Sequence, residues 1–260
     1  MAKERNISYK WLAFFIIFFV IIAFLGIYGA YHYNPSDETI ELEEYCKVST
    51  SDLIKNNSND HIYFVSWDGS PFGDASSWAI YSLLNESHVS NIKYNYTEST
   101  EELQYNNTPG LILYNNTYNF IYNTHKVTLQ TIYLYGENIS NNSHEIKSGL
   151  NELKNMVPES VYNEIEVYTT EAIVDGTSNT SANISSIPHI NTVTLITGKT
   201  GAYLLNGYLL SPGDFEKANK PLTPEVVMEN INGLSDKYPS ITSAVKTSRE
   251  GIESTLKDVQ

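Results

Sequence analysis

The sequence predicts an α/β fold, a mixed sheet with helices on both faces, preceded by one N-terminal transmembrane helix. Three observations lead to this class. An apolar run opens the chain, strand-like and helix-like segments alternate after it, and a stretch at about residues 144–186 reads as a helical insertion. The order strand, helix, strand, helical insertion, strand pair and helix is typical of α/β domains.

The apolar run decides the expected compartment. Residues 11–27 contain no charge, and the run continues to about Tyr31. About 20 apolar residues are enough to span a bilayer as a helix. A cleaved signal peptide is the alternative, but its apolar core would be about 7–15 residues, and no A-x-A site follows. We expect an uncleaved anchor at residues 11–31.

The flanks of this run predict its orientation. Basic residues precede it and acidic residues follow it, and positive flanks favour the cytoplasmic side. We therefore expect a single-pass protein of the cell membrane, with residues 1–10 as a cytoplasmic tail and the remainder extracytoplasmic. Residues 32–59 read as a polar stalk, in which a short helix near residues 41–48 is an option, and the ectodomain is expected over residues 60–260.

The first half of the ectodomain reads mainly as strands. His61–Trp67 is the clearest one, and a helix is expected from Asp74 to about Asn85, with the Asp74 carboxylate as its cap. Residues 91–97 alternate as a strand. Residues 111–114 and 120–122 suggest a hairpin around "NNTYN", and residues 127–135 are again β-rich.

The second half begins with the helical insertion. An apolar stripe runs through residues 144–157, Pro158 interrupts it, and residues 160–174 favour a second helix. After a polar loop come strands at 192–197 and 202–210, joined by "GKTG". Helices are expected to start at Thr223-Pro224 and at Pro239, because proline suits the first helical position.

Composition limits the functional classes. The formal net charge is −14, which argues against nucleic acid as a partner, since phosphate binding requires basic patches.

Cys46 is the only cysteine, so an intramolecular disulfide is excluded. Cys46 either joins two chains or stays a free thiol. No zinc spacing is present, and we expect neither a metal nor a cofactor.

Asn-x-Ser/Thr sequons are dense beyond the apolar run. Together with an external location they predict a glycosylated ectodomain. The candidate sites are Asn56, Asn85, Asn95, Asn106, Asn115, Asn138, Asn141, Asn179 and Asn183.

One stretch carries a family resemblance. "FVSWDGSPFGDASSWAIYSLL", residues 64–84, resembles the signature of a membrane-anchored archaeal and actinobacterial family, domain of unknown function family 929. Residues 105–113, 186–212 and 234–252 are also similar to it. The resemblance implies a thioredoxin-like fold in which a Cys-Pro-Tyr-Cys turn opens the helix. Here Ser70 and Gly73 stand at the two cysteine positions, so we expect no dithiol activity, because exchange requires a thiolate.

The resemblance also implies a cis-proline loop beside the turn that holds Ser70 and Gly73. Ile187-Pro188-His189 is its best match, and Asn107-Thr108-Pro109 is the second. Exposed backbone in such a loop can pair with an extended peptide. The candidate binding residues are Trp67, Pro71, Phe72, Ile187, Pro188 and Pro109.

Ser70 is not expected to be a nucleophile, because no Gly-x-Ser-x-Gly elbow is present, and a serine here more commonly caps a turn. The favoured function is a redox-silent module of the cell envelope that binds protein or peptide. The alternatives are a structural glycosylated surface protein and a thiol-oxidoreductase or folding-factor subunit that acts with a partner's cysteines.

Overall fold

A computed structural model describes residues 39–55, 58–84, 92–97, 105–114, 117–136, 139, 145–217 and 222–260. Residues 38–260 form one compact unit. The predicted tail and anchor, residues 1–31, lie outside the described residues. Among the helices that the structure does describe, none combines the length and the apolar character that a membrane crossing requires.

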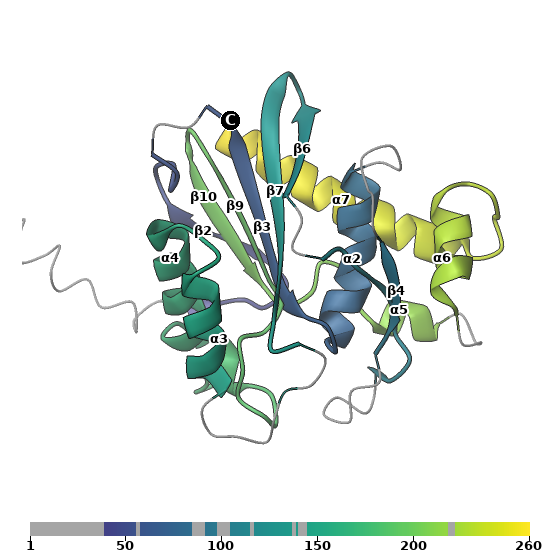
Figure 1. Cartoon of the computed structure of the whole chain (residues 1–260), viewed down its shortest axis with the longest axis horizontal. Coiled ribbons are helices and arrows are strands. Elements are labelled where there is room, and N and C mark those ends of the chain that lie inside the picture. Colours follow the sequence, from purple (N-terminus) through teal and green to yellow (C-terminus); the bar gives the residue numbers. More distant parts are fainter. Residues whose placement is uncertain are drawn as a thin grey trace, which may run out of the picture. The chain divides into compact units, whose positions relative to one another are not determined.

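The core of the unit is a six-stranded mixed sheet (Figure 1). Its strand order is β2-β10-β9-β3-β7-β6. β3 pairs with β7 in parallel, whereas the other neighbours in the sheet are antiparallel. The strands are β2 (Tyr45–Ser49), β3 (Asp60–Trp67), β6 (Thr117–Tyr122), β7 (His125–Leu134), β9 (Val193–Gly198) and β10 (Gly201–Asn206).

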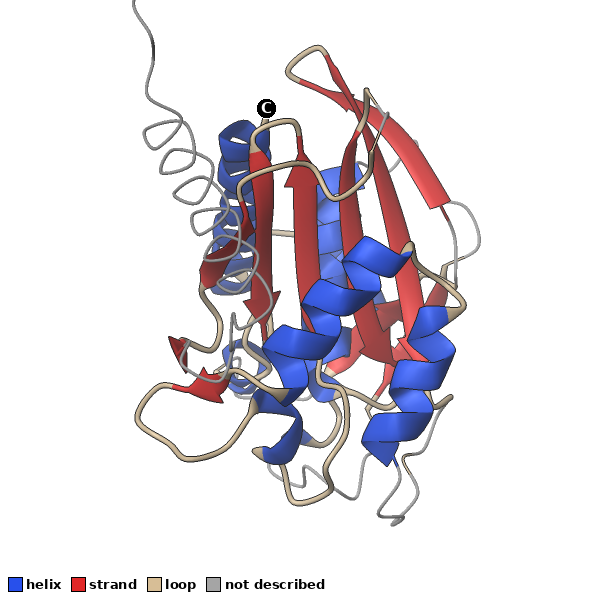
Figure 2. Ribbon diagram, turned by 90° about the vertical axis from the view of Figure 1, so that its left-hand side faces the viewer, coloured by secondary structure: helices blue, strands red, loops and turns tan. Residues whose placement is uncertain are grey.

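Helices cover both faces of this sheet. On one face lie α2 (Pro71–Leu84) and α7 (Pro239–Val259), whose apolar side chains join Ile62 and Phe64 in one core cluster. The short helix α6 (Pro224–Ile231) adds Val227 to the same cluster but packs against α7 rather than on the sheet. On the other face, α3 (Glu145–Lys154) and α4 (Glu159–Thr170) pack with Tyr63 and Val65. Figure 2 views the molecule from the α3–α4 side and shows the strands between the two helical layers.

Burial on both faces explains the sequence of β3. Successive side chains of a strand point to opposite faces, and here each face meets a helical layer. All eight residues of β3 are buried, so the strand reads as a nearly continuous apolar run rather than an alternating one.

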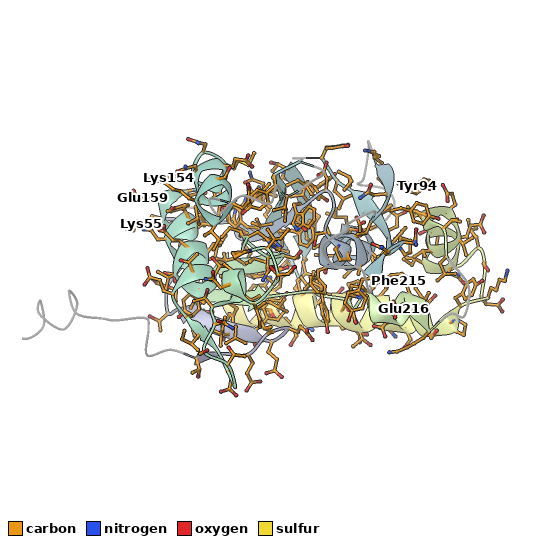
Figure 3. The ribbon with its side chains drawn as sticks, turned by 90° about the horizontal axis from the view of Figure 1, so that it is seen from below. Lys55, Tyr94, Lys154, Glu159, Phe215 and Glu216 are labelled. Atoms are coloured by element: carbon orange, nitrogen blue, oxygen red, sulfur yellow. The ribbon has the colours of Figure 1, made fainter. Side chains whose placement is uncertain are left out.

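Smaller elements complete the unit. β4 (Lys93–Tyr96) pairs with β5 (Pro109–Ile112), and β1 (Thr39–Ile40) pairs with β8 (Ile173–Val174). A 3-10 turn, η4 (Ser181–Asn183), follows β8, and α5 (Gly213–Glu216) follows β10. Figure 3 shows Lys55, Lys154 and Glu159 at the α3–α4 end, and Tyr94, Phe215 and Glu216 at the opposite end.

The expected hairpin around "NNTYN" is wrong. β5 pairs with β4, whereas β6 forms its hairpin with β7 across the two-residue loop Asn123-Thr124. Both loop residues have a positive φ, 48° and 72°, as a type I′ turn requires. The turn signal therefore lies one strand later than the asparagine cluster suggested.

The stalk also ends earlier than expected. β2 is an edge strand of the main sheet, hydrogen-bonded to β10, and Ile40 is buried at 2% exposure. Residues 45–48 form a strand rather than the optional helix, because pairing with β10 supplies partners that local sequence does not reveal.

Candidate site at the start of helix α2

Ser70 caps helix α2. Its Oγ accepts a hydrogen bond from the Gly73 N–H at 3.1 Å, and its carbonyl accepts from the Asp74 N–H at 2.9 Å. The helix begins at Pro71, where proline costs no hydrogen bond. The expectation that Asp74 caps the helix is therefore wrong, because the Ser70 side chain caps it one turn earlier by accepting the Gly73 N–H.

Three buried hydroxyls, those of Ser66, Ser70 and Thr192, meet at the start of α2 and form the Ser66–Ser70–Thr192 corner. Thr192 Oγ1 lies 3.0 Å from Ser66 Oγ and 3.3 Å from Ser70 Oγ. All three residues are at most 2% exposed. Thr192 directly precedes β9 and Ser66 lies on β3, so the contact ties two neighbouring strands to the start of α2. The partners of Ser70 Oγ are a hydroxyl and a backbone N–H, and neither can act as the general base that a nucleophile requires.

Gly73 fits only because it has no side chain. A Cβ at this position would lie 2.0 Å from Ser66 Oγ and 2.9 Å from Ser66 Cβ. Ser66 thus fills the volume into which a side chain at position 73 would project. Sequence reasoning singled out Ser70 and Gly73 but missed Ser66, although it lies in the same stretch, "FVSWDGSPFG".

Neither candidate proline forms a cis peptide bond, because the described residues contain none. Pro109 opens β5 and its carbonyl accepts the Trp78 indole N–H at 2.8 Å. Pro188 is exposed and lies four positions before Thr192, the residue that contacts Ser70. The loop entering β9 therefore meets the corner through Thr192 rather than through Pro188.

Trp67 is part of the core rather than a binding ledge. It is 3% exposed, and its ring packs edge-to-face against His189 with centroids 5.8 Å apart. His189 Nδ1 lies 2.7 Å from the Ile187 carbonyl, to which it donates when protonated there, and burial lowers the pKa of His189. Ile187 remains partly exposed, and Pro71 is buried.

Asp74 is a buried carboxyl that anchors β4. It accepts hydrogen bonds from Thr97 Oγ1 at 2.6 Å and from Asn95 Nδ2 at 3.1 Å. Burial raises the pKa of Asp74 to about 7, although both hydrogen bonds act in the opposite direction. Gly110 of β5 allows the close approach, since a Cβ there would lie 2.4 Å from Asp74 Cβ.

An aromatic cluster of Phe72, Tyr105 and Tyr208 lies beside the helix start. The Phe72 ring centroid is 5.3 Å from that of Tyr208 and 5.9 Å from that of Tyr105. All three side chains are partly exposed. Burial, followed by a hydrogen bond to Glu43, raises the pKa of Tyr208 to about 12. Sequence reasoning found Phe72 alone, because the two tyrosines come from distant loops that carry no motif.

The structure separates the glycosylation candidates. Asn95 is committed to the fold, because its Nδ2 donates to the Asp68 carbonyl at 2.7 Å as well as to Asp74. Three candidates are exposed, namely Asn106, Asn179 and Asn183. The others lie outside the described residues, namely Asn56, Asn85, Asn115, Asn138 and Asn141.

Cys46 lies on the edge strand β2. Its Sγ–H donates to the Leu204 carbonyl at 3.2 Å, and the side chain is partly buried. An interchain disulfide through Cys46 stays a prediction. Among the described residues, no group of three or more His, Cys, Asp or Glu side chains is placed to hold a metal ion.

Comparison with known proteins places the chain in a family. The model for the domain of unknown function DUF929 matches residues 44–254. No curated protein and no solved structure matches the chain. The matched range covers the whole six-stranded sheet, the helices α2, α3, α4 and α6, most of α7 and the Ser66–Ser70–Thr192 corner. The chain therefore belongs to the DUF929 family of domains of unknown function.

Proposed function

We propose that this protein is a membrane-anchored, extracytoplasmic thioredoxin-like module that lacks dithiol chemistry and binds protein or peptide segments. The sheet supports the thioredoxin-like assignment. A parallel β3–α2–β7 unit is followed by the antiparallel pair β9–β10 and a closing helix, with order β7-β3-β9-β10. That arrangement is the one expected of a thioredoxin-like domain, and α2 begins where the redox turn would lie.

The packing at Gly73 is the observation that supports the proposed lack of dithiol chemistry. Ser66 Oγ occupies the space that a second cysteine would need, and Ser70 Oγ is buried among hydrogen-bonding partners. The corner is thus closed by hydroxyls rather than prepared for a thiolate at a helix N-terminus.

The binding part rests on the aromatic cluster. Partly exposed aromatic rings are enriched at protein interfaces, where they supply rigid contact area at a low entropy cost. Phe72, Tyr105 and Tyr208 lie at the opening of α2, so an extended segment could pack against them without reaching Ser70. Trp67 and Pro71 are buried and are not part of this surface.

A binding assay with a permanently unfolded probe tests this proposal. Fluorescently labelled S-carboxymethylated α-lactalbumin would be titrated with the full chain in detergent, and its anisotropy recorded. We expect binding that Phe72→Ala and Tyr208→Ala weaken by at least tenfold. Tyr114→Ala is the matched control, because Tyr114 is an exposed tyrosine, 43% exposed, outside the cluster. Equal binding by all variants would contradict the proposed surface, and no binding at all would favour a structural surface protein.

The proposed location rests on the residues 11–31 and their flanks. Protease treatment of intact cells should digest the domain while sparing the first residues, and a glycosidase should shift the mobility of the chain. Cleavage only after the cells are opened would contradict an extracytoplasmic domain.

A further inference from the structure

β6 forms one margin of the sheet, and the strands that the structure describes leave its outer side without a paired neighbour. β6 is the last strand in the sheet, and within the described part of the chain it pairs with β7 alone (Figure 1). Its sequence, "TYNFIY", contains no charge, no proline and no glycine. Ile121 is 72% exposed. Edge strands that remain unpaired in solution usually carry charges, prolines or bulges that block further pairing.

The opposite margin carries such features. β2 holds Lys47, whose ammonium lies 5.6 Å from the centre of the Tyr203 ring. The pairing of β2 with β10 is also irregular between Ala202 and Tyr203. A charge and a local irregularity both disfavour the addition of a strand. The difference between the two edges singles out β6 as an edge built for pairing.

The hairpin fixes which backbone groups of β6 face outward. Tyr122 and His125 close the two-residue loop and form its hydrogen-bonded pair. Hydrogen-bonded and non-bonded pairs alternate along an antiparallel ladder. Thr117, Asn119 and Ile121 therefore point their N–H and C=O groups away from β7, where the described part of the chain supplies no partner.

We propose that β6 pairs antiparallel with β6 of a second copy of this chain, so that the two sheets continue into one. The outward groups place Asn119 opposite its own copy on the two-fold axis. Thr117 then lies opposite Ile121, and Tyr118 opposite Phe120, each twice by symmetry. This contact uses a surface remote from the aromatic cluster and does not depend on the binding function proposed above.

The side chains favour a second copy over an unrelated strand. The self-pairing places Phe120, a partly exposed ring, beside Tyr118, which is 7% exposed, at non-hydrogen-bonded positions, where cross-strand side chains lie closest. On the other face it joins two β-branched pairs, Thr117 with Ile121. The chain carries a net charge of −14, so most surfaces of one copy would repel another copy. β6 contains no charged residue, so two β6 strands can meet without charge repulsion between them.

Cysteine pairing tests both the contact and its register. The full chain with Cys46→Ser would carry Asn119→Cys, and it would be oxidised mildly and examined on a non-reducing gel. Facing Cα atoms in a hydrogen-bonded antiparallel pair lie about 5.5 Å apart, within the range that a disulfide bridges. We expect most of the Asn119→Cys chain to become a dimer that reduction dissolves.

Matched positions on the same strand are the controls. Thr117→Cys alone and Ile121→Cys alone should form no disulfide-linked dimer and should run as monomers on the denaturing gel, because neither lies opposite itself, whereas an equal mixture of the two should cross-link. Far-ultraviolet circular dichroism checks that each variant is folded. A folded Asn119→Cys chain that stays monomeric would overturn the proposal, as would Thr117→Cys cross-linking equally well alone.

Introducing a charge at Asn119, the two-fold position, gives a second test without cysteines. Asn119→Lys alone and Asn119→Asp alone should each shift the dimer to monomer in sedimentation velocity, because two like charges then face each other. Mixing the two variants should restore the dimer. An unsubstituted chain that sediments as a monomer across all accessible concentrations would also overturn the proposal.

Discussion

Replacing Gly73 with alanine should destabilise the protein, although the same change usually stabilises a helix. In a helix interior, alanine is favoured over glycine by about 1 kcal/mol. At position 73 the added Cβ would lie 2.0 Å from Ser66 Oγ, far inside contact distance, so Ser66 must move. Overpacking of this kind costs about 1–3 kcal/mol. Loss of the 3.0 Å contact between Ser66 and Thr192 costs about 1 kcal/mol more. The net expectation is a loss of about 1–3 kcal/mol.

A double-mutant cycle isolates the cause. Ser66→Gly removes the two atoms that the new Cβ would meet within 3.0 Å and leaves only Ser70 Cβ at 3.4 Å, so the double variant Ser66→Gly/Gly73→Ala should be more stable than the sum of the single changes predicts. We expect a coupling of about 1–3 kcal/mol between the two positions. Urea unfolding monitored by tryptophan fluorescence gives the free energy of unfolding of the unsubstituted chain, the two single variants and the double variant.

Gly251 of α7 provides the matched control. A Cβ there has nothing within 4 Å, so Gly251→Ala should stabilise the protein by about 1 kcal/mol. If Gly73→Ala also stabilised the protein, or if its effect and that of Ser66→Gly were simply additive, the packing argument at this corner would be wrong.

Two further predictions concern the buried carboxyl and the hairpin loop. The pKa of Asp74 is raised in the folded state, so stability should fall as pH rises from about 4 to about 7, and Asp74→Asn should lose that part of the slope in urea unfolding measured across this range. A slope unchanged by the substitution would show that Asp74 is not the group responsible. Thr124 has a φ of 72°, which strains a β-branched residue, so Thr124→Gly should raise the free energy of unfolding by about 1 kcal/mol, whereas a loss would contradict the type I′ turn.

Local signals in the sequence were sufficient for the elements around the corner. The apolar run at residues 61–67 predicted β3, and the expected serine capping role is confirmed by the Ser70–Gly73 hydrogen bond. Thr223 caps α6 as its Thr-Pro pair indicated, accepting from the Val226 N–H. These features depend on neighbours within one helical turn, so sequence reasoning could reach them.

Contacts between distant residues account for what the sequence could not predict. Ser66 and Thr192 are 126 positions apart, and nothing in either local pattern announces their contact. The aromatic cluster likewise joins three separate segments. The stalk was misplaced for the same reason, because the strand character of residues 45–49 comes from pairing with β10. Strand preference depends on such neighbours more than helix preference does.

Restoring the two cysteines tests the central claim most directly, namely that this corner is a thioredoxin-type site whose chemistry has been replaced by packing. The full chain would carry Ser70→Cys and Gly73→Cys in a Cys46→Ser background, with Ser66→Gly to make room for the second side chain. Its thiols would then be titrated against glutathione. We predict a reversible disulfide between positions 70 and 73 in the folded protein, formed less readily when Ser66 is retained. Two thiols that stay reduced under oxidising conditions in a folded chain would contradict the account.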